Sequence, residues 1–211
     1  MEGLVDAVIK WEKEHWVPYP WRVDRTPYKV LVAEVLLQRT TRKAVSRVYN
    51  TFLSEFPDIS SIYRASPHEL ELALKPIGLY KQRATRLKEI AKAIVEVFGG
   101  TIPCDYASLN GIYGVGPYIA GAVLSFGCGK KAPVVDSNVM RLLGRAFGVK
   151  GPRDAIEFLW GLVPESGHEF FNYGLVDLGA YVCAYRGPKC SECPLRPYCE
   201  YYASSTASRA R

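Results

Sequence analysis

Four cysteines near the C-terminal end constrain this chain more than any other feature. Cys183, Cys190, Cys193 and Cys199 are separated by six, two and five residues and fall within seventeen residues. A short loop can fold four thiolates at this spacing around one centre, which suits a [4Fe–4S] cluster or a tetrahedral zinc ion. Zinc ribbons usually carry two C-x2-C pairs, whereas here only Cys190 and Cys193 form one. The spacing therefore favours the cluster, with zinc and then two disulfides as alternatives.

The rest of the composition describes a chain that can bury a sizeable core as one or two lobes. It has 211 residues, of which 48% are hydrophobic. No apolar run is long enough to span a membrane and residues 1–10 lack a signal-peptide pattern, so we expect an intracellular protein. The net charge of +6 favours a polyanionic partner, although a solvated basic surface gives the same balance. Cys104 and Cys128 are isolated in sequence and are expected to be small buried hydrophobes.

Hydrophobic periodicity predicts an all-α fold without strands or internal repeats. A turn-rich connection is expected over residues 19–26, a lobe boundary over 128–133 and a frayed tail after residue 202. Thr26 before Pro27, and Ser66 with Glu69, are helix-start signals. The predicted helices cover residues 3–14, 27–38, 41–56, 66–75, 81–98, a short segment ending near 112, 117–126 and 138–147.

The glycines of the Gly114–Gly116 segment, within residues 109–119, predict a helix–hairpin–helix. Gly114, Val115 and Gly116 would form a tight turn, and Pro117 would begin the next helix. Such a turn presents free N–H groups and a helix N-terminus, which together bind phosphate. The alternative is a tightly packed corner between two helices.

Asp136 follows an apolar stretch and precedes a predicted helix. Its ordinary role would be to cap that helix, with its carboxylate accepting a backbone N–H. A capping carboxylate is held rigid at a lobe boundary, and an ionised carboxylate can stabilise a developing sugar cation, as in glycoside hydrolysis. The two roles are compatible.

Together these motifs resemble the helix-hairpin-helix DNA glycosylases of the endonuclease III superfamily. The resemblance covers residues 20–199 and includes PWRVDRTPYKVLVAEVLLQRT, IGLYKQRA, the GVG hairpin, VVDSNVMR and the cysteine quartet. It implies a two-lobe, all-α fold that binds double-stranded DNA, flips out a damaged or mismatched base and hydrolyses its N-glycosidic bond. We expect a monomer. The expected parts are a helix-hairpin-helix lobe over 24–131, a lobe with a C-terminal iron–sulfur cluster loop over 1–23 plus 132–202, and a flexible tail over 203–211.

The resemblance also implies which residues outside the hairpin meet DNA. Residues 38–40 resemble the loop that enters the space vacated by the flipped base, and the turn at 78–80 resembles the wedge inserted from the other side. The cluster would organise a basic loop over 185–189 that contacts the backbone. Plain core packing at the wedge and a solvated surface at the loop are the alternatives. The residues implied are Gln38, Arg39, Thr40, Leu79, Tyr80, Arg186 and Lys189.

Tyr118 stands where bifunctional members of the superfamily carry the lysine that forms a Schiff base. A phenol, with a pKa of about 10, cannot form an imine. We therefore predict a monofunctional enzyme that leaves an abasic site, with Lys130 and Lys131 keeping a lyase activity open. The thymine/uracil mismatch branch resembles this chain in having tyrosine here, where it would stack on or orient a flipped pyrimidine. Ordinary helix packing is the alternative.

Glu34 lies in an otherwise apolar predicted helix, where a carboxylate tends to have a raised pKa or a specific partner. It would hydrogen-bond the flipped base or donate a proton, unless it simply pairs with Arg39. The chain ends twelve residues after Cys199, without the C-terminal domain that the adenine branch usually appends. We therefore expect thymine or uracil opposite guanine as the substrate. A truncated adenine glycosylase is the alternative; a non-catalytic DNA-binding module would need neither Glu34 nor Asp136.

Overall fold

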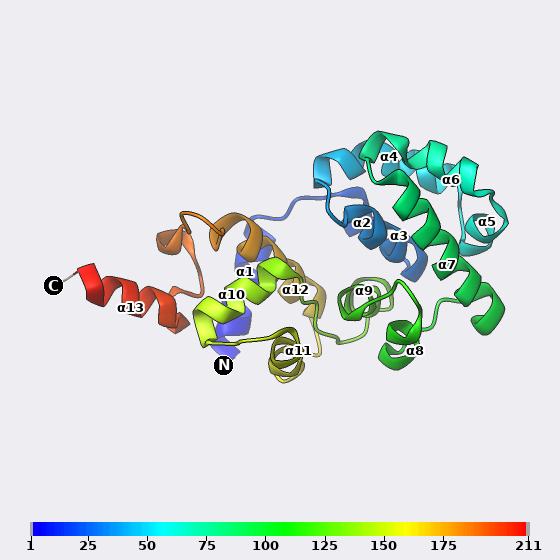
Figure 1. Cartoon of the computed structure of the whole chain (residues 1–211). Helices are drawn as coiled ribbons and strands as arrows, with labels where there is room; N and C mark the ends of the chain where they lie inside the picture. The colour runs from blue at the N-terminus through cyan, green and yellow to red at the C-terminus, as the bar shows by residue number, and fades with distance from the viewer. Residues whose placement is uncertain (1, 210–211) are drawn as a thin grey trace. The chain divides into compact units, whose positions relative to one another are not determined.

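The computed structural model describes residues 2–209, and this part of the chain contains helices and no strand, as predicted (Figure 1). None of its helices combines the length and the apolarity needed to cross a bilayer. Short 3-10 or π turns lie at Lys75–Ile77, Val123–Gly127, Leu178–Val182, Cys190–Glu192 and Arg196–Tyr198. The α-helices are α1 Glu2–Glu14, α2 Pro20–Val23, α3 Pro27–Leu37, α4 Arg42–Glu55, α5 Ile59–Arg64, α6 Pro67–Leu74, α7 Tyr80–Phe98, α8 Tyr106–Gly111, α9 Pro117–Ala122, α10 Ser137–Phe147, α11 Pro152–Trp160, α12 His168–Asp177 and α13 Glu200–Arg209.

The chain divides into two compact units. Unit 1 is built from the described parts of Met1–Val17 and Lys131–Arg211, and unit 2 is Pro18–Lys130. Helix α2 belongs to unit 2, because it packs on α3 and α4. The first boundary between the two units therefore lies at residues 17–18, before the boundary that we expected at residue 23.

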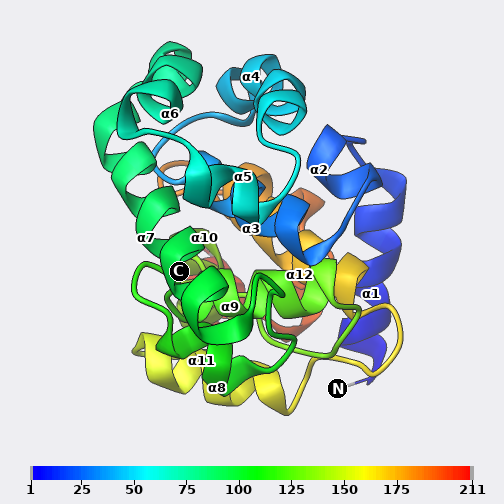
Figure 2. The same cartoon turned by 90° about the vertical axis from the view of Figure 1, so that its right-hand side faces the viewer.

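Helix α3 is the centre of unit 2. Every residue from Val30 to Leu36 is buried, so the helix has no polar face. Helices α4, α7 and α9 pack against it, and α5 and α6 lie along α7 (Figure 2). A functional side chain on α3 is therefore held in a fixed, largely apolar setting.

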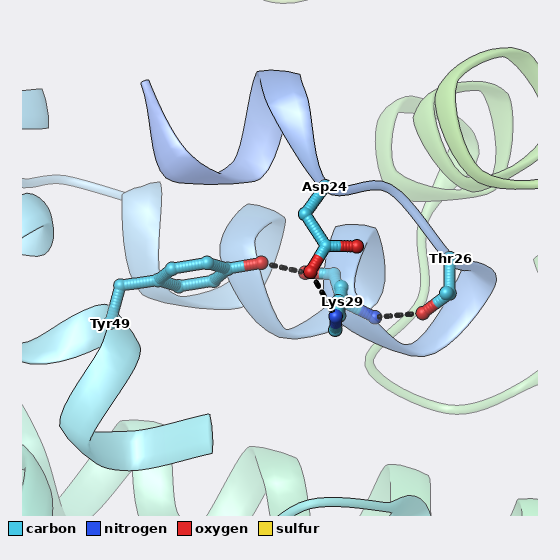
Figure 3. A network of polar contacts seen from close by, with 4 residues as sticks. All are labelled: Asp24, Thr26, Lys29 and Tyr49. Atoms are coloured by element: carbon cyan, nitrogen blue, oxygen red, sulfur yellow. Dashed lines mark hydrogen bonds and ion pairs between the residues drawn. The ribbon is translucent and has the colours of Figure 1, made fainter. Parts of the chain in front are cut away.

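The start of α3 is fixed by the polar contacts shown in Figure 3. Thr26 caps the helix, since its side chain accepts a 3.2 Å hydrogen bond from the Lys29 N–H. The Lys29 ammonium pairs with Asp24, and the Tyr49 hydroxyl from α4 donates to the Lys29 carbonyl oxygen at 2.9 Å. Burial, and then the nearby Asp24 and Glu34 carboxylates, raises the pKa of Tyr49 above its ordinary value, so its hydroxyl stays a donor.

The core of unit 1 lies between α1, α10, α11 and α12. Leu4, Val8, Leu143 and Phe171 are among its fully buried side chains. Helix α12 packs along α1, and a Cβ on Gly174 would lie 2.7 Å from Val8 Cγ1. Glycine at this position permits the close approach of the two helices.

Cys104 and Cys128 form a disulfide, so their assignment as isolated hydrophobes is wrong. They are 24 residues apart, but α8 and α9 fold back on each other as a hairpin. The two ends of that hairpin therefore meet, with 5.9 Å between the two Cα atoms. The disulfide closes a covalent loop around the whole helix–hairpin–helix.

The segment after residue 202 is helical instead of frayed. Helix α13 runs through it to Arg209, and packs on α10. The side chains of Ser204 and Ser205 hydrogen-bond back to the carbonyl oxygens of Tyr201 and Tyr202 within the helix. Residues 210 and 211 of the predicted tail lie outside the described residues.

Candidate active site

The predicted hairpin forms a tight turn between α8 and α9. Gly114 has a φ of +90°, which L side chains rarely adopt, and a Cβ there would lie 3.3 Å from Arg86 Cγ. Val115 is buried, and its N–H donates to the Ile112 carbonyl oxygen at 2.9 Å. Val115 therefore anchors the turn from within. Gly116 precedes α9 as its N-cap residue.

A hollow, here called the hairpin hollow, lies over this turn. It is lined by residues 110–117 together with Gln38 and Arg86. Tyr113 is 82% exposed beside it, although the sequence analysis did not single it out. An exposed aromatic ring next to the predicted phosphate-binding turn offers a flat surface for a sugar or a base.

The structure brings Glu34 and Tyr118 together. Glu34 lies in the middle of α3 and is 4% exposed. Tyr118 lies in the first turn of α9, and its hydroxyl donates a 2.6 Å hydrogen bond to Glu34 Oε2. The packing of α3 on α9 explains how residues 84 positions apart in the sequence meet. The carboxylate thus has the specific partner that its apolar surroundings require.

Two turns in unit 2 hold non-glycine residues in a left-handed conformation. Arg39 has a φ of 56° and Leu79 a φ of 48°, and no other non-glycine residue among those described has a positive φ. Such a conformation costs on the order of 1–3 kcal/mol and persists only where the surroundings enforce it. Leu79 is 40% exposed and Arg39 is exposed too, so neither side chain belongs to the core.

Arg83 ties these two turns together from inside. It is 4% exposed, and its Nη1 donates to the carbonyl oxygens of Val35 and Leu36 at 2.9 and 2.7 Å. Its Nη2 donates to Gln38 O at 2.7 Å and its Nε to Gly78 O at 3.1 Å. One buried guanidinium therefore satisfies the carbonyl end of α3 and fixes the residues that precede Arg39 and Leu79.

A second depression, here called the wedge groove, lies between these turns and the hairpin. Gln38 and Arg86 line it as well as the hairpin hollow, so the two depressions share a wall. The groove is rich in basic side chains, which raises the local concentration of a polyanion. Its lining residues are Val35, Gln38, Arg39, Leu79, Lys81, Gln82, Arg83, Thr85, Arg86, Glu89, Tyr113 and Gly114.

In unit 1, Asp136 caps α10 as predicted. Its Oδ1 accepts from the N–H groups of Asn138 and Val139 at 2.9 and 2.7 Å, and the Asn138 amide donates to Oδ2 at 2.8 Å. The fully buried Asn172 of α12 holds the preceding segment, because it donates to the Ala132 carbonyl oxygen at 2.9 Å. The carboxylate is therefore fixed from both sides while it remains half-buried.

The four thiols of Cys183, Cys190, Cys193 and Cys199 are free and line a single pocket of unit 1. Burial raises the pKa of the Cys193 thiol to about 11, and burial followed by the neighbouring thiols raises that of Cys190. Without a bound cation, the thiols of Cys190 and Cys193 thus resist ionisation. Among the described residues, no three or more His, Cys, Asp or Glu side chains are grouped so that they could hold a metal ion.

Arginines of α10 hold the backbone around the first cysteine. Arg141 Nε donates to Cys183 O at 2.9 Å, and its Nη2 donates to Asn138 Oδ1 at 2.9 Å. Arg145 donates to Ala184 O at 2.8 Å and lies 3.5 Å from Cys183 Sγ. Asn138 therefore contacts both the Asp136 carboxylate and the arginine that fixes the cysteine loop.

The predicted basic loop is exposed. Arg186 and Tyr185 are both on the surface, with Tyr185 75% exposed. Lys189 Nζ lies 3.7 Å from the Glu192 carboxylate, so part of its charge is offset locally. Arg186 is therefore the stronger candidate for a phosphate contact.

Sequence reasoning missed Arg83, Arg86, Arg141 and Arg145. Each lies on an amphipathic helix, where a basic residue ordinarily marks the solvated face. A signal was present in the IGLYKQRA segment, since its arginine follows a turn that also carries the expected wedge. Distances alone revealed that these guanidinium groups hold loops in place.

Comparison with known proteins agrees with this arrangement. Residues 32–165 match the model of the HhH-GPD superfamily of base excision DNA repair proteins. The thymine/uracil-DNA glycosylase of Pyrobaculum aerophilum is 38% identical over 208 residues, covering 93% of this chain and 90% of that protein. The adenine DNA glycosylase of Buchnera aphidicola is 34% identical over 190 residues, 87% of this chain but 54% of that protein.

Among solved structures, a thermostable thymine-DNA glycosylase superposes with a TM-score of 0.88 at 34% identity, covering 95% of both chains. The all-α fold expected from the resemblance is thereby confirmed. The family model matches more than half of this chain. The chain therefore belongs to the HhH-GPD superfamily of base excision DNA repair proteins and is a DNA glycosylase.

Proposed function

We propose that this glycosylase excises thymine or uracil mispaired with guanine and leaves an abasic site. The contact between the Tyr118 hydroxyl and Glu34 carries this proposal. A carboxylate oxygen accepts hydrogen bonds, and thymine and uracil present an N3–H donor where cytosine presents an acceptor. Tyr118 fixes Glu34 from one side and offers its ring to a flipped pyrimidine. The thymine and uracil glycosylases among the relatives support this substrate.

Asp136 would stabilise the cationic sugar that develops as the N-glycosidic bond breaks, or activate the attacking water. Its three hydrogen bonds hold the carboxylate without neutralising it. Preorganised charge of this kind requires no reorganisation during the reaction. The basic loop, the hairpin and the segments at 38–40 and 78–80 would bind double-stranded DNA around the mismatch, with one protein molecule per lesion.

Monofunctional chemistry is part of the proposal. Tyr118 cannot form an imine, and the two lysines named as substitutes are engaged. Lys130 Nζ donates to Cys104 O at 2.7 Å, and Lys131 Nζ pairs with the Glu165 carboxylate at 3.0 Å. Each amine would have to leave its partner before it could attack a sugar.

We also propose a [4Fe–4S] cluster held by Cys183, Cys190, Cys193 and Cys199, as the superfamily resemblance implies. Four free cysteine thiols line one pocket and supply the ligand type that such a cluster takes, although they would have to draw together around it, and Arg145 would offset its negative charge. When bound, it would organise the 185–189 loop for DNA contact. The anaerobically purified protein should be brown with stoichiometric iron and sulfide; a colourless protein with one zinc ion would overturn this assignment.

One assay tests the reaction. Labelled duplexes carrying T·G, U·G, A·G or A·8-oxoguanine pairs are incubated with the protein and analysed with and without alkali. We expect product from T·G and U·G duplexes only, and strand breaks only after alkali. Excision of adenine instead would favour the adenine glycosylase alternative, which the Buchnera relative keeps open. Breaks without alkali, together with borohydride trapping, would show lyase activity.

A further inference from the structure

Arg86 and Gln38 form a contact that the proposed reaction does not use. The Arg86 guanidinium of α7 donates a hydrogen bond to Gln38 Oε1 at the C-terminal end of α3. Both side chains are half-buried, and they form the wall shared by the wedge groove and the hairpin hollow. The pair therefore lies among the segments proposed to meet the DNA around the mismatch.

Both partners are held in place by their surroundings. Arg83 donates to the Gln38 carbonyl oxygen at 2.7 Å, which fixes the backbone of Gln38. The aliphatic stem of Arg86 lies against the hairpin, where a Cβ on Gly114 would come within 3.3 Å of its Cγ. The contact is thus built into three elements and is more than an encounter of two long surface side chains.

The chemistry of the pair fixes the direction of the Gln38 amide. A guanidinium carries donors and no acceptor, so the amide must turn its oxygen toward Arg86. Its amino group then points away from Arg86 and is presented to any further partner. With Arg86 and the exposed Arg39 beside it, this wall offers hydrogen-bond donors to a base.

The donors that Gln38 and Arg86 present discriminate between purines. Guanine presents two acceptors, O6 and N7, on one edge, whereas adenine presents an N6 amino donor beside N7. A freely rotating glutamine amide could serve either base by turning around, but an amide held by Arg86 cannot. We propose that Arg86 is the positioning and specificity residue that makes Gln38 recognise O6 of the guanine left opposite the flipped base.

This proposal rests on the proposed function only in that a base is flipped and its partner stays behind. Binding can therefore test it without excision. Duplexes carry a tetrahydrofuran abasic analogue opposite guanine, inosine, adenine or 2-aminopurine, and fluorescence anisotropy gives each affinity. Inosine keeps O6 and N7, while 2-aminopurine lacks O6. We expect wild-type protein to bind the guanine and inosine duplexes about tenfold more tightly than the other two, as one good base contact provides.

The variants separate orientation from charge. R86L should bring the guanine-to-adenine affinity ratio close to one, since the amide can then rotate. R86E presents an acceptor, turns the amide around and should favour adenine. Lys92→Glu, on an exposed position of the same helix, makes the same charge change and should keep the ratio. In a Q38A background, R86L should change the ratio less than in the wild type.

Equal wild-type affinity for guanine and adenine duplexes would overturn the proposal, as would an unchanged ratio in R86L. Should R86L fail to fold, Q38A and R86K replace it in the same binding comparison. The guanine-to-adenine affinity ratio should fall in Q38A. The proposed function fails separately: a protein that prefers guanine in these duplexes but excises adenine would refute the thymine/uracil assignment and leave the role of Arg86 intact.

Discussion

At the scale of single residues, a substitution at Asp136 distinguishes its role as a helix cap from its proposed role in catalysis. Asp136→Asn should keep the cap of α10, because asparagine caps helices as well as aspartate does. It removes the charge proposed to stabilise the sugar cation, so we expect single-turnover excision to fall by about 10²–10³-fold or more. Duplex affinity, measured by anisotropy, should stay equal or rise because a carboxylate no longer repels phosphate. A near wild-type rate would contradict the assignment.

Tyr118 tests the chemistry proposed for unit 2. Tyr118→Phe keeps the ring but removes the hydroxyl that donates to Glu34, and a lost hydrogen bond to a buried carboxylate costs roughly 1–3 kcal/mol. We expect a lower melting temperature and slower excision with similar binding to abasic DNA. Tyr118→Lys places an amine on α9 and should give weak borohydride trapping, whereas wild-type protein should give none. Efficient trapping by the wild type would direct attention to Lys130 and Lys131.

At the scale of elements, a covalent bond closes the α8–α9 hairpin. The Cys104–Cys128 disulfide removes entropy from the unfolded chain by closing a loop of about 25 residues, worth roughly 3 kcal/mol. The Cys104→Ser, Cys128→Ser double variant should therefore melt several degrees lower, by calorimetry without reductant. In the presence of reductant, wild type and variant should melt alike. If they also melt alike without it, the two thiols are not joined in solution.

At the scale of the whole molecule, binding should depend steeply on salt. Positive side chains that meet phosphates release counterions, so the logarithm of affinity falls with the logarithm of salt concentration. Arg186→Ala should weaken binding to all duplexes alike and reduce the slope by about one. Lys189→Ala should have a smaller effect, because Glu192 already offsets that charge. An affinity that does not change between low and high salt would show that the basic charge of +6 is only solvated surface.

The sequence predicted most of the elements that begin with a local signal. The caps at Thr26, Ser66 and Asp136 were predicted because a helix cap depends on residues that are neighbours in the sequence. Helix α12 was missed because most of its residues are buried, which leaves no amphipathic stripe. Helix α2 was missed because its four residues are too few to show a period. Helix α11 was missed although Pro152 marks its start.

The candidate site was predicted as a set of residues but not as a set of contacts. Glu34 and Tyr118 were each singled out, while their hydrogen bond depends on how α3 packs on α9. The Cys104–Cys128 bond was missed for the same reason, since spacing in sequence says nothing of a hairpin's two ends. Contacts between elements depend on how the elements pack, and a single sequence does not reveal that packing.

The covalent loop has one more consequence. Tyr113, 82% exposed at the hairpin turn, is the kind of site at which a protease cuts a chain. A cut there would fall inside the ring closed by Cys104 and Cys128, so the two halves of the protein would remain one molecule until the disulfide is reduced. A cut at this exposed turn would thus leave both fragments covalently joined.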